Sequence, residues 1–169
     1  MKNLVEKIIS NIKEQKLTTF AAVLSFVNLV LFHVNFYSYV LNNVEQGFNG
    51  IVIVVSLVLI MLLANFFAFT LLLYLGGLIG KIILSAFFMC NAMSLYFINT
   101  YNVMLDDAMM GNFWNTQYSE ASGFFSWAML LYVLFLGVIP SLYIFAIKVN
   151  RGGFKRFLST IGITILGLL

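Results

Sequence analysis

The residues best suited to contact a ligand lie between Tyr96 and Ser122, in a polar and aromatic stretch set between long apolar runs. Read as a helix from about Asp107, this stretch advances by about 100° per residue and separates into two faces. The face that can form hydrogen bonds carries Asn112, Asn115, Thr116, Ser119 and Glu120, and the opposite face carries Met110, Phe113, Trp114 and Tyr118. Such a helix is expected to lie along a membrane surface. We therefore expect its polar face to meet a lipid headgroup, although the pattern alone also fits a face that meets only water.

The composition places the whole chain in a membrane. Of its 169 residues, 62% are apolar and only 9% are charged, and the mean hydropathy is +1.01. A soluble domain does not have this composition, because it would have to expose much of its apolar surface to water. The sequence therefore predicts a protein with several transmembrane segments.

The elements that must position the polar stretch are apolar helices. Runs over 17–41, 51–75, 82–100 and 124–149 are each long enough to cross a hydrocarbon core of about 30 Å. Residues 157–169 are apolar but too short to cross, so we expect them to begin a fifth span of a longer protein. We predict an all-α bundle of five transmembrane helices, with an amphipathic cytoplasmic N-terminus over 1–16 and an interfacial helix over 103–121.

The charges predict an orientation for these helices. All nine Lys and Arg residues fall in the N-terminal segment and in the second and fourth loops. Four of the six acidic residues, Glu45, Asp106, Asp107 and Glu120, fall in the first and third loops. Because positive loops stay on the cytoplasmic side, we expect the N-terminus in the cytoplasm and the segment 103–121 outside. The basic fourth loop is expected to set this topology and to meet anionic lipid.

The sequence contains few residues that could bind a metal ion or react as a thiol. The chain has one cysteine and one histidine, too few for the usual His and Cys metal sites. Cys90, in an apolar run, is expected to pack in the core. His33 is expected to form a helix-to-helix hydrogen bond, since no acidic residue lies within a span to pair with it.

The polar stretch also carries a family resemblance. The letters YFINTYNVMLDDAMMGNFWNTQYSEA, which begin at Tyr96, resemble the lipid A phosphoethanolamine transferases, among them the polymyxin (colistin) resistance enzymes of Gram-negative bacteria. Supporting matches are NFYSY from Asn35, Lys81 at the start of the third span, and GVIPSL from Gly137. The resemblance covers nearly the whole chain.

The resemblance implies a function and a site. Family members have five membrane helices and a periplasmic domain of alkaline-phosphatase type, which holds zinc and a catalytic threonine. The implied reaction moves phosphoethanolamine from phosphatidylethanolamine to lipid A or another surface acceptor in the bacterial inner membrane. The family's membrane-side substrate residues fall on Asn112, Thr116 and Glu120. The catalytic domain is absent from this sequence, so the fragment alone is expected to be inactive and to need no cofactor.

One departure from the family and two alternatives qualify this interpretation. The family often has a basic residue early in the fourth helix, whereas this chain has none between Glu120 and Lys148. A small multi-pass carrier or a membrane assembly subunit would also be rich in apolar helices. The membrane domain of a phosphoglycerol transferase-like enzyme would share the five-helix plan.

Overall fold

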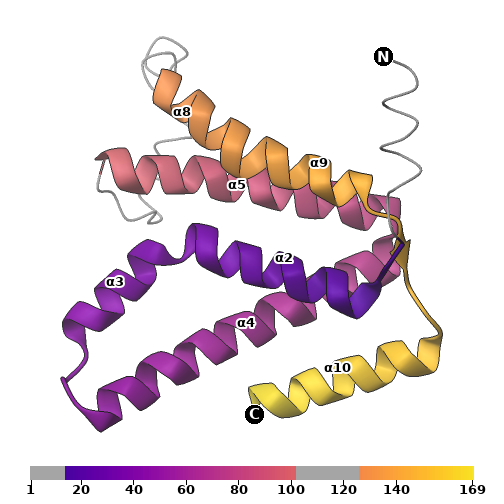
Figure 1. The fold of residues 1–169 in the computed structure, drawn as a ribbon, viewed down its shortest axis with the longest axis horizontal. Coiled ribbons are helices and arrows are strands. Elements are labelled where there is room, and N and C mark those ends of the chain that lie inside the picture. The colour runs from indigo at the N-terminus through magenta and orange to yellow at the C-terminus, as the bar shows by residue number, and fades with distance from the viewer. Residues whose placement is uncertain (1–13, 102–125) are drawn as a thin grey trace, which may run out of the picture. The chain divides into compact units, whose positions relative to one another are not determined.

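The structure is a computed structural model that describes residues 14–101 and 126–169, and these residues are almost entirely helical (Figure 1). In chain order, the helices are α2 (Leu17–Phe32), α3 (Val34–Asn43), α4 (Phe48–Gly76), α5 (Leu78–Tyr101), α8 (Trp127–Tyr132), the π-helix η1 (Val133–Val138), α9 (Ile139–Ala146) and α10 (Phe154–Leu168). The strands of the described residues are β1 (Gln15–Lys16) and β2 (Val149–Asn150). The predicted all-α class is confirmed apart from these two short strands. The chain divides into two compact units, Met1–Leu84 with Tyr143–Leu169, and Ser85–Leu142.

Several helices are long and apolar enough to cross a membrane. Within the described residues there are three of them, Phe48–Gly76, Leu78–Thr100 and Trp127–Ala146, or up to four if the bent pair of α2 and α3 crosses as one. Helix α4 has 29 residues, and at about 1.5 Å per residue it exceeds a hydrocarbon core of about 30 Å. Helix α10 has 15 residues. The described residues therefore contain three or four candidate spans of a membrane protein, and the fifth predicted span stays a prediction.

The predicted span over 17–41 is two helices rather than one straight helix. α2 and α3 meet at an angle of 63°, and His33 lies between them with a φ of −107° and a ψ of 8°. The Nδ1 atom of His33 is 3.2 Å from the carbonyl oxygen of Asn28. The helix-to-helix hydrogen bond predicted for His33 is therefore wrong, because this contact leads back to α2. Neither Pro nor Gly, the usual causes of a kink, marks this position.

The first unit is built on α4, against which both α2 and α10 pack. Tyr74 of α4 and Phe157 of α10 stack with ring centroids 3.8 Å apart. Asn28 of α2 is buried, and its Nδ2 donates a hydrogen bond of 3.2 Å to Oδ1 of Asn65 on α4. Lipid offers no hydrogen-bond partner to these side-chain amides, so the amides of the two helices bond to each other. A polar residue inside an apolar run is expected to face another helix or the outer interface, and Asn28 faces α4.

The connection between α4 and α5 is a single residue, Gly77, which has a φ of +54°. Glycine adopts this left-handed conformation without steric cost. One turn later, a Cβ atom on Gly80 would collide with the carbonyl oxygen of Leu72, so the start of α5 touches the backbone of α4. In the sequence, Gly76, Gly77 and Gly80 together predict a tight reversal, and the structure confirms it.

A short parallel ladder joins distant parts of the first unit. In this ladder Gln15 is opposite Val149, and Lys16 is opposite Asn150. The backbone N–H of Gln15 also donates to the carbonyl oxygen of Lys148 at 2.9 Å. The amphipathic helix predicted over 1–16 lies mostly outside the described residues, and it does not extend to Lys16, because Gln15–Lys16 is a strand. This pairing was not predictable from two polar residues.

The second unit contains the later part of α5 and the helix that begins after Ser126. Gly137 in η1 lies so close to Met89 of α5 that a Cβ atom at Gly137 would overlap the Met89 sulfur. The π-helix ends two residues before Pro140. Proline lacks an N–H and crowds the preceding turn, and a wide π turn relieves that conflict. In the sequence, Gly137 and Pro140 predict a bent or loosened helix, and the π-helix confirms it.

The outer surfaces of both units are apolar. Phe48 is 80% exposed, Trp127 is 84% exposed and Leu166 is 73% exposed. No residue of the most apolar 18-residue window of α4 is buried inside the protein. Apolar surface of this extent needs lipid around it, because exposed patches on soluble proteins are far smaller.

Candidate functional site

The predicted site residues Asn112, Thr116 and Glu120 lie outside the described residues, as does the whole predicted interfacial helix over 103–121. The structure therefore leaves their arrangement as a prediction. It does describe both attachment points of that segment, at the end of α5 and the start of α8.

A cluster of hydroxyl and aromatic side chains joins these two attachment points. Ser126 is the N-cap residue of α8, and its Oγ accepts a hydrogen bond of 3.1 Å from the backbone N–H of Met129. The same Oγ lies 2.7 Å from the hydroxyl of Tyr96 on α5. Tyr96 is only 2% exposed, so this contact is shielded from competing water. One serine thus caps α8 and ties it to α5.

A second contact reinforces this cluster. The side-chain amide of Asn99 on α5 donates a hydrogen bond of 3.0 Å to the hydroxyl of Tyr132 on α8. The ring of Tyr132 meets the ring of Tyr96 edge to face, with centroids 5.7 Å apart. We call Tyr96, Asn99, Ser126 and Tyr132 the anchor cluster. This cluster holds the end of α5 close to the start of α8.

Sequence analysis recognised Tyr96 and Asn99 as part of the polar stretch but missed Ser126 and Tyr132. A signal for Ser126 was present, because serine directly before an apolar helical run is a preferred N-cap residue. Tyr132 carried no comparable signal. In the sequence, Tyr132 cannot be distinguished from other aromatic residues of an apolar helix, because the partner of its hydroxyl lies on the neighbouring helix.

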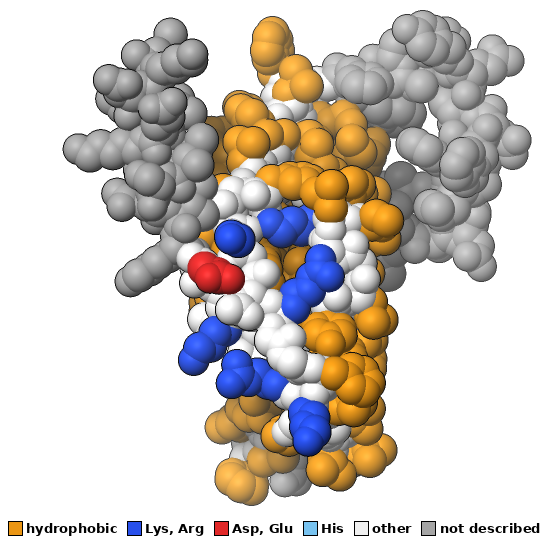
Figure 2. All heavy atoms as spheres, turned by 90° about the vertical axis from the view of Figure 1, so that its right-hand side faces the viewer, with side chains coloured by type: hydrophobic (Ala, Val, Ile, Leu, Met, Phe, Trp, Pro, Cys, Tyr) orange, Lys and Arg blue, Asp and Glu red, His pale blue; other side chains and the backbone are white. Residues whose placement is uncertain are grey.

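The first unit carries a basic face at the end where its strands lie. Figure 2 shows Lys and Arg side chains gathered on this face. The Lys and Arg residues of the described chain are Lys16, Lys81, Lys148, Arg151, Lys155 and Arg156. The described acidic residues are Glu14, which precedes β1 at the basic end, and Glu45, which precedes α4 and so lies at the opposite end of that helix; Figure 2 accordingly shows an acidic side chain among the basic ones. This separation of charge along α4 has the form that the positive-inside rule requires.

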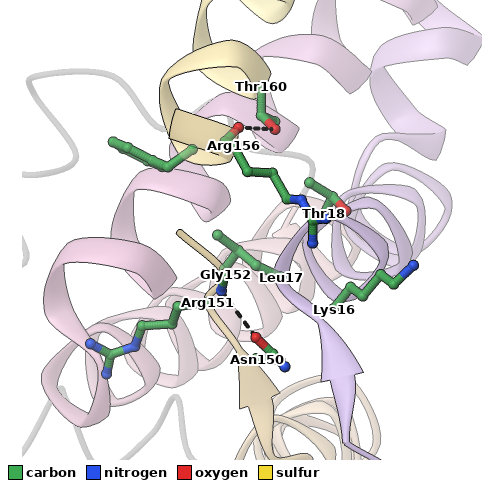
Figure 3. A pocket seen from close by; sticks show the side chains of 9 residues that line it. Lys16, Leu17, Thr18, Asn150, Arg151, Gly152, Arg156 and Thr160 are labelled. Atoms are coloured by element: carbon green, nitrogen blue, oxygen red, sulfur yellow. Dashed lines mark hydrogen bonds between the residues drawn. The ribbon is translucent and has the colours of Figure 1, made fainter. Parts of the chain in front are cut away.

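A small pocket on the basic face is lined by residues from three segments (Figure 3). In this view Arg156 reaches from α10 toward Thr18, whereas Lys16 and Arg151 extend away from it. The pocket has a volume of about 10 Å³, which suits a single water molecule. This pocket is therefore a packing gap between β1, β2 and α10 rather than a binding site.

The described residues hold no group of three or more His, Cys, Asp or Glu side chains that could bind a metal ion. Cys90 is exposed on the surface of α5, so the core-packing role predicted for it is wrong. Cys90 lies in an apolar run, and residues of such a run can face either lipid or the protein core. Residue type alone therefore did not show which of these two environments surrounds Cys90.

The fold and the anchor cluster define a helical membrane protein in which hydrogen bonds join the end of α5 to the start of α8. Comparison with known proteins identifies its family. The family model described as "Phosphoethanolamine transferase EptA/EptB" matches residues 61–169, which is more than half of the chain. The chain therefore belongs to the phosphoethanolamine transferase family of EptA and EptB, and it corresponds to the N-terminal membrane domain of such a protein.

A curated relative supports this assignment. The chain is 32% identical over 81 residues to the phosphoethanolamine transferase EptA of Helicobacter pylori, a match that covers 47% of this chain. The matched part spans only 16% of that protein's length. No solved structure matches the chain.

Proposed function

We propose that this chain is the membrane domain of an enzyme that transfers phosphoethanolamine from phosphatidylethanolamine to lipid A or another surface acceptor. In this proposal the domain anchors a catalytic domain that lies outside the chain and helps to bind the lipid donor. Zinc and the catalytic threonine belong to that other domain, and the chain alone does not turn over. The assignment rests on the family and on the anchor cluster, which holds both ends of the predicted lipid-binding segment.

The proposed arrangement has five transmembrane helices in the bacterial inner membrane. The N-terminus and the basic face of the first unit lie on the cytoplasmic side, as the positive-inside rule favours. Residues 103–121 form an interfacial helix on the periplasmic side, between the third and fourth spans. A phospholipid then reaches the polar face of this helix by lateral diffusion, which raises its effective concentration near the catalytic domain.

Within that helix, Asn112, Thr116 and Glu120 are the proposed contacts of the donor lipid. Residues four apart on a helix drift by about 40° per step and share one face. The Glu120 carboxylate provides the negative charge that an ammonium group needs, and the amide and hydroxyl can bond to phosphate or glycerol oxygens. The family match, rather than the spacing alone, selects these three residues from the polar face.

The test is a Glu120→Gln variant of the intact protein, which keeps the size of the side chain and removes its charge. A charge-assisted hydrogen bond contributes about 1.5–3 kcal/mol, so we expect transfer from phosphatidylethanolamine to fall by about 10-fold to 100-fold. Activity is measured in proteoliposomes at equal amounts of inserted protein.

Glu45→Gln is the matched control, because Glu45 is an exposed acidic residue of the turn before α4. This control should retain nearly all activity. Full activity of the Glu120→Gln variant at equal insertion removes Glu120 from the site, and an equal loss in both variants shows that only surface charge matters.

A further inference from the structure

A cavity on the basic face has no part in the proposed function. It lies at the turn between α4 and α5 and has a volume of about 220 Å³. It is lined by Leu73, Gly77, Leu78, Lys81, Val149 and Arg151. Its wall therefore combines apolar side chains with two cationic ones and contains no acidic residue. Unlike the pocket of Figure 3, this cavity has room for more than one water molecule.

The two cationic side chains reach the cavity from different elements, and each keeps N–H donors that can bond to a ligand. The Nζ atom of Lys81, in the first turn of α5, donates to the carbonyl oxygen of Ile147 at 2.5 Å, which uses one of its three donors. The guanidinium of Arg151 lies over Gly77, where a Cβ atom would collide with it. Within residues 14–101 and 126–169 Arg151 has neither a hydrogen bond nor an ion-pair partner for its side chain, although a guanidinium offers five donors.

A purely structural role explains part of this arrangement. A cation near the last turn of a helix is favourable because of the helix dipole, and Arg151 sits at the end of α4 while Lys81 bonds just beyond the end of α9. That role requires neither an open cavity nor apolar residues beside the charges. Among the described residues neither cation has an ion-pair partner, and both line the cavity beside apolar side chains. This combination matches a ligand with a phosphate at one end and hydrocarbon at the other.

We infer that this cavity binds the phosphate of an anionic phospholipid from the membrane leaflet that the basic face contacts. Lys81 and Arg151 contact the phosphate, and the apolar wall lies beside the glycerol and the upper acyl chain. A defined site of this kind differs from general attraction of a basic loop to an anionic surface, which any exposed lysine would supply. The inference concerns the opposite end of α4 from Glu45, and it stands or falls independently of the proposed transfer reaction.

The test compares lipid binding by the intact protein and its variants in mild detergent, where no lipid surface is present. Phosphatidylglycerol and phosphatidylcholine are added separately, and bound lipid is counted by native mass spectrometry. Arg151→Gln is the main variant, because it breaks no hydrogen bond among the described residues. Lys155→Gln is the matched control, because it removes the same charge from an exposed position on α10 that does not line the cavity.

We expect the unmodified protein to bind phosphatidylglycerol in preference to phosphatidylcholine. Arg151→Gln should weaken this binding by about 10-fold, the effect of losing a charge-assisted contact, whereas Lys155→Gln should change it by less than about 2-fold. Arg151→Lys, which keeps the charge but loses the planar fork, should lie between these values. Lys81→Gln should also weaken binding, and a thermal melt separates this effect from any loss of folding.

Three results would overturn the inference. Equal losses in Arg151→Gln and Lys155→Gln would mean that attraction is nonspecific. Equal binding of the two lipids would mean that the cavity does not recognise an anionic headgroup. Displacement of phosphatidylglycerol by inorganic phosphate at the same concentration would show that a free phosphate, and not a lipid, is the ligand.

Discussion

Replacing Ser126 by alanine tests whether the anchor cluster holds the second unit together. The substitution removes the N-cap acceptor of α8, which contributes about 1 kcal/mol, and the contact with the buried hydroxyl of Tyr96, which contributes about another 1 kcal/mol. The expected loss in the free energy of unfolding is therefore about 2 kcal/mol. For a chain of this length that corresponds to a drop of about 4–8 °C in Tm.

The measurement is a thermal melt together with an unfolding titration in mixed micelles. Ser141→Ala is the matched control, because the Ser141 hydroxyl bonds at 2.7 Å to the Gly137 carbonyl one turn earlier and reaches α5 only through a long contact of 3.5 Å with the Ser85 carbonyl. This local bond adds little to stability, so the control should change Tm only slightly. Equal effects of the two alanine substitutions would refute the role given to Ser126.

A double-mutant cycle then separates the cap from the tie between helices. Tyr96→Phe alone should cost about 1 kcal/mol, because it removes only the hydroxyl. In the Ser126→Ala background the same change should cost less, since the Ser126 hydroxyl is already gone. Fully additive costs would mean that the 2.7 Å contact between Tyr96 and Ser126 contributes no stability.

Three further predictions concern packing and topology. Gly80→Ala should destabilise the protein by about 1–3 kcal/mol in a thermal melt, because the added methyl group overpacks against α4. The control is Gly76→Ala, whose Cβ would meet nothing within 4 Å and which should change stability by less than about 1 kcal/mol. Similar melts for the two variants would contradict the close approach of α5 to α4. Asn28→Ala should cost about 1 kcal/mol in a micellar unfolding titration, because it leaves its amide partner on α4 unpaired, and an unchanged midpoint would mean that this bond is not formed. A cysteine at Asn115, introduced after Cys90→Ala, should react with a membrane-impermeant maleimide from the periplasmic side, and labelling only from the cytoplasmic side would reverse the proposed topology.

The sequence was sufficient where one dominant physical effect acts on a local stretch. Long apolar runs fixed the membrane class, because no other solvent accommodates them. Glycines marked the tight turn around Gly77, and Pro140 marked the loosened helix, since each has a steric requirement that only a few backbone conformations meet. These features could be read without knowing any neighbouring helix.

The sequence was insufficient where a partner distant along the chain decides the structure. The hydroxyl of Tyr132, the exposure of Cys90 and the ladder between β1 and β2 all depend on which segments meet. The bend at His33 is similar, because neither of the usual kink residues is present and the side chain turns back to Asn28. The roles proposed for Asn112, Thr116 and Glu120 came from the family resemblance, since their spacing alone fits any amphipathic helix.

The π-helix η1 has a consequence for how the Trp127–Ala146 helix meets its surroundings. A π turn holds one more residue than an α turn, and each additional residue rotates the following side chains by about 100° around the axis. A stripe of side chains that faces one neighbour before Val133 therefore faces a different direction after Val138. A single apolar helix can in this way offer one flank to the protein near Ser126 and another flank near Ser141, so that substitutions on the two sides of the bulge should be grouped by separate helical wheels.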